Sequence, residues 1–181
     1  MSHEEVHEMH EQAEHGAHDP SLLPVTFTMA VLAVVLAATS LLGHRTHTEE
    51  LLLQNKATDQ WAYYQAKNIR RHTYELFLDL LSVSAVKDTE QANKVKEKYT
   101  KEVERYRDEQ NEIESEARTL ENEVYLERRR ANRFDLGEVF LEAAIVIASL
   151  TLLTKRRLFW QLGVLMGVTG LGVTLTGFLV H

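Results

Sequence analysis

The sequence lacks the residues on which many kinds of functional site depend. None of its 181 residues is cysteine, which excludes disulfides, cysteine-based metal or redox centres and a cysteine nucleophile. Only two prolines and eight glycines are present, and so few turn-forming residues argue against an all-β fold. A net charge of −7 argues against a nucleic-acid partner. No nucleophile–base pair, phosphate loop or dinucleotide fingerprint is present, so we do not expect an enzyme.

What the sequence does have is three apolar blocks, each close to the thickness of a bilayer. The first has no charge from Val25 to Leu42, and eighteen helical residues at about 1.5 Å each span about 27 Å. The blocks are 21–43, 136–154 and 158–180, and a basic turn at 155–157 separates the last two. We expect three transmembrane helices, of which the last two form a hairpin in the membrane.

Between the first and second blocks, residues 44–135 contain neither proline nor glycine. Two rows of residues recur there at alternating steps of four and three, the spacing of a coiled-coil seam. The first row is Ala62, Ala66, Ile69, Thr73, Leu76, Leu80 and Val83, and the second is Tyr99, Val103, Tyr106, Gln110, Ile113, Ala117, Leu120 and Val124. The pattern breaks near 82–89. We therefore expect an all-α protein with a long antiparallel helical hairpin between the first and second transmembrane helices.

The first arm of this hairpin has more apolar residues than one seam requires. Leu51, Leu52 and Leu53 are consecutive, and Trp61 and Tyr64 lie beside the predicted seam. The excess indicates a second contact surface on this arm.

The N-terminal tail, residues 1–20, holds six acids, five histidines and no lysine or arginine. Histidines and carboxylates four residues apart share one face of a helix, and imidazole suits divalent transition metals such as zinc or nickel. The candidate metal ligands are His3, His7, His10, Glu11, His15 and His18. The alternative is a solvated tail whose histidines meet metal only incidentally.

Two acids, Glu138 and Glu142, lie at the start of the second block. A carboxylate at membrane depth is costly and usually faces protein or water. One interpretation is an acidic site in a cation path or a proton-binding site. The other is an interfacial carboxylate that extends to the headgroups or pairs with a nearby arginine.

Small residues recur along one face of each block, which lets helix backbones approach closely in lipid. The candidate packing residues are Ala30, Ala33, Ala37, Ala144, Ala148, Gly163, Gly167, Gly170 and Gly177. They favour tight packing within the chain and also association between chains.

Four arginines, Arg128, Arg129, Arg130 and Arg133, precede the second block and are candidates to hold anionic lipid headgroups. They also act as a topology signal. Six basic residues near membrane ends lie on the hairpin side and three lie in the turn at 155–157, so the positive-inside rule places the hairpin in the cytoplasm and the tail in the periplasm. The basic turn favours the opposite orientation.

The run SLLGHRTHTEELLLQNKATDQWAYYQAKNIR, which starts at Ser40, and its DQWAYYQAK core in particular, resemble a bacterial membrane family catalogued as domain-of-unknown-function family 4337. The resemblance covers roughly residues 20–180. It implies one span, a long helical region and two further spans in a bacterial inner membrane. It implies no catalytic residues.

From these patterns we expect a membrane protein that serves as a structural or scaffolding element and forms a homo-oligomer in the lipid bilayer. The first alternative is an oligomeric cation channel or transporter that uses Glu142 and a metal-gathering tail. The second is an accessory subunit whose partner is a larger membrane complex.

Overall fold

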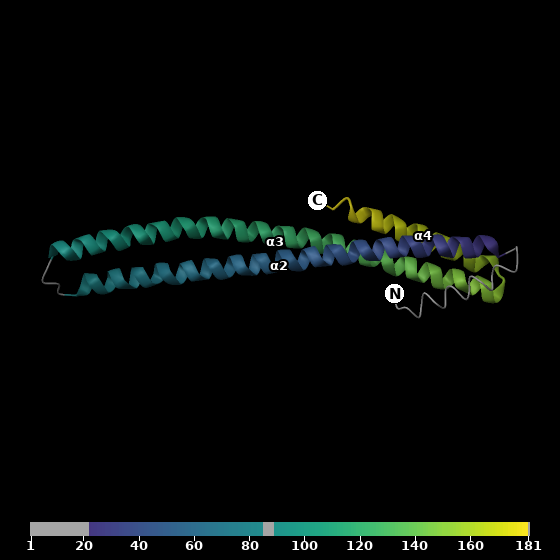
Figure 1. The fold of residues 1–181 in the computed structure, drawn as a ribbon, viewed down its shortest axis with the longest axis horizontal. Helices are drawn as coiled ribbons and strands as arrows, with labels where there is room; N and C mark the ends of the chain where they lie inside the picture. Colours follow the sequence, from purple (N-terminus) through teal and green to yellow (C-terminus); the bar gives the residue numbers. More distant parts are fainter. Residues whose placement is uncertain (1–21, 85–88, 181) are drawn as a thin grey trace. The chain divides into compact units, whose positions relative to one another are not determined.

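The computed structural model describes residues 22–84 and 89–180, and the described chain is built from three long helices (Figure 1). Helix α2 covers Leu23–Val83, α3 covers Thr89–Thr154 and α4 covers Arg157–Gly177. No strand occurs in these ranges. The predicted all-α class, with three long apolar helices and close packing of the first two, is confirmed.

Helix α2 continues without a break from an apolar segment into a polar one, and α3 continues from a polar segment into an apolar one. Pro24 is compatible with this continuity because it lies in the first turn of α2, where a missing N–H disturbs no helical hydrogen bond. The chain divides into two compact units. Unit 1 comprises Met1–Glu49 with Leu126–His181, and unit 2 is Glu50–Tyr125.

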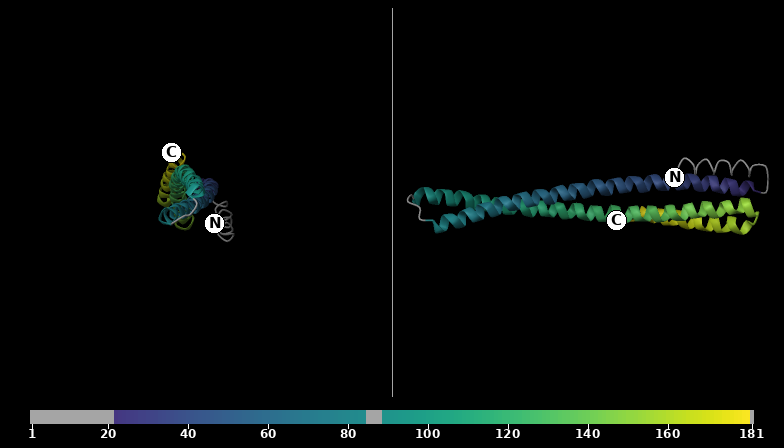
Figure 2. Two further views of the ribbon diagram at one scale, coloured as in Figure 1. Left: turned by 90° about the vertical axis from the view of Figure 1, so that its left-hand side faces the viewer. Right: turned by 90° about the horizontal axis from the view of Figure 1, so that it is seen from below.

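Unit 1 is a bundle in which α3 runs antiparallel to α2 and α4. The end of α4 lies against the polar end of its α3 segment, because Arg130 donates a hydrogen bond to the carbonyl of Val180 at 3.1 Å. Near the start of α4, Trp160 donates from Nε1 to Oγ1 of Thr28 in α2 at 3.1 Å. Figure 2 shows α4 lying along α3.

The core of unit 1 combines large side chains of α2 with both large and small side chains of α3. Residues of α2 at steps of three and four fill it, and they meet a similar row of α3. The buried cluster is Val25, Met29, Leu32, Leu36, Leu141, Ala144, Ile145 and Ala148. The alanines of α3 leave room for the larger side chains beside them, so the helices interdigitate.

A tight turn joins α3 to α4. Lys155 has a φ of 54°, in the left-handed region that non-glycine residues seldom adopt. Its backbone N–H donates to the carbonyl of Thr151 at 2.8 Å, so the turn begins by closing the last turn of α3. Arg156 is extended, and α4 starts at the next residue.

Unit 2 is an antiparallel pair formed by the polar parts of α2 and α3, which lie side by side in Figure 1. Tyr74 of α2 stacks with Tyr99 and Tyr106 of α3 at centroid distances of 5.0 and 5.7 Å. The row predicted for α3 is the one that packs: Tyr106, Gln110, Ile113, Ala117 and Val124 are buried, and Tyr99, Val103 and Leu120 are half-buried. The prediction for the second arm is confirmed.

Candidate interaction surface

Within unit 2, α2 does not pack against α3 through the row that its apolar residues predicted. The residues facing α3 form a different heptad row, which we call the inner row. Its members are all buried or half-buried: Leu53, Ala57, Gln60, Tyr64, Lys67, Arg71, Tyr74, Leu78 and Leu81. Polar residues in this row reach partners on α3, because Gln60 donates to Glu116 at 2.6 Å and Lys67 donates to Glu109 at 2.5 Å. The predicted first-arm seam is therefore corrected.

The predicted row is exposed instead, and we call it the outer row. Its members are Ala62, Ala66, Ile69, Thr73, Leu76, Leu80 and Val83, and every one is exposed. The exposed fractions are 67% for Ile69, 61% for Leu76 and 81% for Val83. Outer-row residues lie two positions from inner-row residues, about 200° around the helix, so the two rows are on opposite sides of α2.

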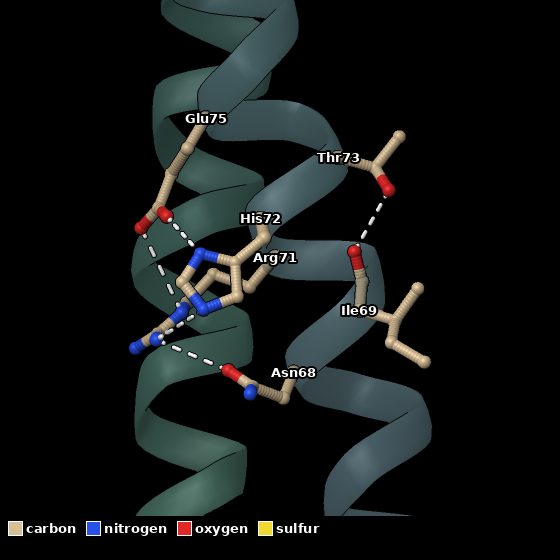
Figure 3. A network of polar contacts seen from close by, with 6 residues as sticks. All are labelled: Asn68, Ile69, Arg71, His72, Thr73 and Glu75. Atoms are coloured by element: carbon tan, nitrogen blue, oxygen red, sulfur yellow. Dashed lines mark hydrogen bonds and ion pairs between the residues drawn. The ribbon is translucent and has the colours of Figure 1, made fainter.

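Figure 3 shows the two sides of α2 at one level. Arg71 donates to Asn68 at 3.1 Å, and Glu75 accepts from His72 at 2.8 Å. These polar side chains gather on one side of the helix, whereas Ile69 and Thr73 point away from them. The only polar contact drawn on the Ile69 side is internal to the helix: the Thr73 hydroxyl donates to the carbonyl of Ile69 at 2.7 Å.

The facing helix of unit 2 has no comparable surface. From 89 to 124, a stretch the structure describes throughout, α3 exposes no large hydrophobic side chain. Its outward face carries charged residues paired with each other, as in Lys101 with Glu97 at 2.7 Å and Arg118 with Glu114 at 2.8 Å. The exposed large apolar side chains of unit 2 therefore lie on α2, apart from Tyr125 at the end of the α3 segment.

A charged and aromatic layer crosses the middle of unit 2. The hydrogen bond from Lys67 to Glu109 raises the pKa of Lys67, although partial burial acts in the opposite direction. A hydrogen bond from Arg70 lowers the pKa of Tyr106, and Arg105 adds to this effect. Lys67 and Arg70 of α2 thus bind Glu109 and Tyr106 of α3, respectively. These contacts between the helices favour one register of α2 against α3.

The two acids of the second apolar block have no such partners. Gly43 ends the charge-free run of α2, and a Cβ there would lie 3.5 Å from the Asp135 carboxylate of α3. Glu142 follows Asp135 by seven residues, which places it about 10 Å inside the apolar layer. Glu142 is exposed and Glu138 half-buried, and no hydrogen bond or ion pair links either acid to another residue in the described ranges. The predicted pairing with a nearby arginine is absent there.

The arginines predicted to hold lipid headgroups do not share one environment. Arg130 is half-buried, pairs with Glu127 and donates to the carbonyl of Val180. Arg128, Arg129 and Arg133 are exposed. Arg130 therefore joins α3 to the end of α4, and the side chains of Arg128, Arg129 and Arg133 lie at the surface.

The structure brings the small residues of α3 and α4 together. A Cβ built at Gly163 would lie 2.9 Å from the carbonyl oxygen of Ala144 and 3.0 Å from the Cβ of Ala148. One at Gly170 would lie 3.0 Å from the carbonyl oxygen of Gly137, and one at Gly177 would meet the ring of Phe134. These glycines permit backbone contact that no larger residue allows.

The small residues of α2 are placed differently. Ala30 and Ala37 are exposed, and only Ala33, which is half-buried, packs against the core of the bundle. The larger Leu32 is used instead, and its Cδ2 would lie 2.5 Å from a Cβ at Gly167. Glycines on α4 leave room for large α2 side chains, and a small face on α2 is not needed there.

The sequence reasoning did not single out Gly137, although it lies seven residues before Ala144 on the same face of α3. A Cβ at Gly137 would collide with the Thr174 hydroxyl and lie 3.1 Å from the Gly170 carbonyl oxygen. It was missed because it belongs to the charged end of the block. Its heptad spacing from Ala144 is the signal that would have found it.

The six candidate metal ligands of the tail, His3, His7, His10, Glu11, His15 and His18, lie outside the described residues. Among the residues the structure does describe, no group of three or more histidine, aspartate or glutamate side chains is arranged to hold a metal ion.

The fold and its surfaces define the class of protein. In the described chain, three helices are long and apolar enough to cross a membrane, and the hairpin of unit 2 is mostly polar, with its exposed large apolar side chains concentrated on α2. Over the described residues the chain is all-α, and its three apolar helices are compatible with a membrane protein of three spans. It belongs to the family described as domain of unknown function (DUF4337), whose profile matches residues 22–180. No curated protein and no solved structure matches the chain.

Proposed function

We propose that this protein is a structural, scaffolding element of the membrane. The helices of unit 1 anchor it, and unit 2 presents the outer row to another helix. The exposure of a complete heptad row on α2 is the observation that carries this proposal. Single exposed apolar residues are ordinary on a soluble surface, but a row at coiled-coil spacing is a helix-packing surface.

The hydrophobic effect supports a covered outer row. Fully burying a leucine, isoleucine or valine side chain contributes about 1.5 to 3 kcal/mol. Ile69, Leu76, Leu80 and Val83 are each more than half exposed, so each gains on the order of 1 kcal/mol when another helix covers it. The proposed role is non-catalytic: burial of the outer row against another helix provides the free energy of association.

Paired substitutions on the outer row test the proposal. Leu76→Glu combined with Leu80→Glu places two charges in the surface, whereas Ser115→Glu places one on the outward face of α3. We expect the double variant to leave its native complex, measured as native mass after gentle extraction, while its helical circular dichroism is unchanged. The Ser115→Glu control should remain in the complex. A double variant of unchanged native mass would contradict the proposal.

A second candidate function rests on Glu142. An unpaired carboxylate about 10 Å inside an apolar layer and on the outside of its bundle needs a polar partner from elsewhere. A ring of such acids in an oligomer would line a cation path. This candidate predicts cation flux into liposomes that Glu142→Gln reduces several-fold and that Glu123→Gln, on the unit 2 surface, does not change. A folded oligomer without flux would eliminate it.

The location of the protein follows from the same proposal. The excess of basic residues at the membrane ends on the hairpin side supports placing unit 2 in the cytoplasm of a bacterial cell and the tail in the periplasm. Arg128, Arg129 and Arg133, which are exposed, are available to anionic headgroups on that side.

A further inference from the structure

Helix α2 of unit 2 has two heptad faces on opposite sides, and its own chain occupies only one. The inner row packs against α3, and the outer row is exposed along its whole length. A helix with two such faces lies between two other helices in a packed assembly. The helix that covers the outer row must supply an apolar heptad row of its own.

We infer that this second helix is α2 of another copy, packed through the same outer row, parallel and in register. The inference rests on the proposed function and names its partner. Within unit 2, the outward side of α3 cannot supply the complementary row, because residues 89–124 expose no large hydrophobic side chain. The outer row is the apolar heptad row that unit 2 leaves available, and two identical rows related by a twofold axis complement each other.

The membrane determines the direction. Copies inserted with the same topology are related by a rotation about the membrane normal, so each residue lies at the same depth as its counterpart. Because α2 is one continuous helix from its charge-free segment to Val83, antiparallel pairing of two outer rows would require opposite insertion. Ile69, Leu76 and Leu80 therefore each face the same residue of the second copy.

Flanking side chains are compatible with this register. In a parallel pair, residues just before one seam position face those five positions later on the other helix. Gln65 then faces Arg70, His72 faces Phe77 and Asp79 faces Ser84, so no like charges oppose each other. Asp59, at the next seam position before Ala62, would face its own counterpart, and this repulsion ends the seam at Ala62.

The size of the surface explains why the membrane matters for this contact. From 62 to 83 the outer row is about 32 Å long, and with helices about 10 Å apart the pair buries roughly 600 Å² in total. A stable complex in solution usually buries at least about 1,200 Å². Shared orientation in one membrane lowers the entropic cost of association, so the contact forms there and weakens in dilute detergent.

Single cysteines test the register directly, because the protein contains no native cysteine. The outer-row variants are Ile69→Cys, Leu76→Cys and Val83→Cys, made in the full chain in native membranes. Ser115→Cys, on the exposed outward face of α3, is the matched control. After mild oxidation, each outer-row variant should give a disulfide-linked species of twice 20.8 kDa, several-fold more abundant than that of the control.

Three results would overturn the inference. These are outer-row cysteines that cross-link no more than Ser115→Cys, cross-linking at only one of the three positions, and a cross-linked species that contains a different polypeptide. In the last case the outer row still joins the protein to another helix, so the proposed scaffolding role stands and only the identity of the partner changes. Absence of cross-linking together with a native mass of one chain would contradict both the pairing of two copies and the proposed scaffolding role.

Discussion

At the scale of single residues, contacts in unit 1 depend on glycines that have no room for a methyl group. Gly163 is the clearest case, because a Cβ there would lie within 3.1 Å of three atoms of Ala144 and Ala148. Gly172, on the same helix, has nothing within 4 Å of its Cβ position. The two positions differ in packing and share the same helical backbone.

We therefore predict that Gly163→Ala lowers the free energy of unfolding by about 1 to 3 kcal/mol, the usual cost of overpacking. Gly172→Ala should leave it unchanged or raise it by up to about 1 kcal/mol, because alanine favours a helix more than glycine does. Denaturation in detergent micelles, followed by circular dichroism, measures both. Equal effects of the two substitutions would show that α4 does not pack through Gly163.

The ion pair between Lys67 and Glu109 gives unit 2 a predicted pH dependence. The hydrogen bond raises the pKa of Lys67 in the folded state above its ordinary value of 10.5, so the pair stabilises the fold below that pH. This stabilisation is lost as the pH rises through the folded-state pKa. The Lys67 side chain is only 14% exposed, so solvent screens the pair less than an ordinary surface pair.

Glu109→Gln should accordingly reduce the stability of unit 2 by about 1 kcal/mol at neutral pH. The difference from the wild type should shrink above about pH 10.5. Glu112→Gln, at an exposed position with no partner in the described chain, should show no such difference at either pH. Urea denaturation at neutral pH and above about pH 10.5 measures the free energy of unfolding of each variant. An effect of Glu109→Gln that does not change with pH would contradict the stabilising role of the Lys67–Glu109 pair.

At the scale of whole elements, the spacing of apolar residues in the sequence identified the packing face of α3 but not that of α2. On α3 the most apolar heptad row is also the buried one. On α2 the inner row contains Gln60, Lys67 and Arg71, whose long stems cover the seam, and the polar ends of Gln60 and Lys67 reach α3. The sequence therefore predicted three helices and a turn, whereas the choice between two heptad rows on one helix required the positions of the partners on α3.

The small-residue faces follow a similar rule. The glycines of α4 and the alanines of α3 pack as their spacing predicted, because backbone contact requires small residues on both helices. Ala30 and Ala37 of α2 stay exposed since Leu32 and its neighbours fill the space beside Gly167. Spacing alone could not tell which helix contributes the large side chains.

A matched pair of substitutions tests the two faces of unit 2. Ile113 lies in the buried seam and is 6% exposed, whereas Ile69 lies in the outer row. In dilute detergent, we expect Ile113→Ala to cost about 2 to 5 kcal/mol. Ile69→Ala should cost less than about 0.5 kcal/mol. Hydrogen exchange of the amides between 50 and 125 reads out unit 2, and a larger effect of Ile69→Ala would reverse the assignment of inner and outer rows.

At the scale of the whole molecule, the proposed orientation has a direct test. Ser115→Cys lies in unit 2, and Thr154→Cys lies beside the basic turn; both positions are exposed. With unit 2 in the cytoplasm, a membrane-impermeant maleimide should label Thr154→Cys in intact cells and Ser115→Cys only after permeabilisation. The reverse pattern would place unit 2 outside the cell and would show that the basic turn controls insertion.

We propose that this protein works by assembling with copies of itself in the membrane. The native mass of the complex, with identification of every subunit, tests this assembly after extraction from the membrane into lipid nanodiscs without detergent. We expect an integer multiple, two or more, of 20.8 kDa made only of this chain. A single chain, or a complex that contains other polypeptides, would contradict it.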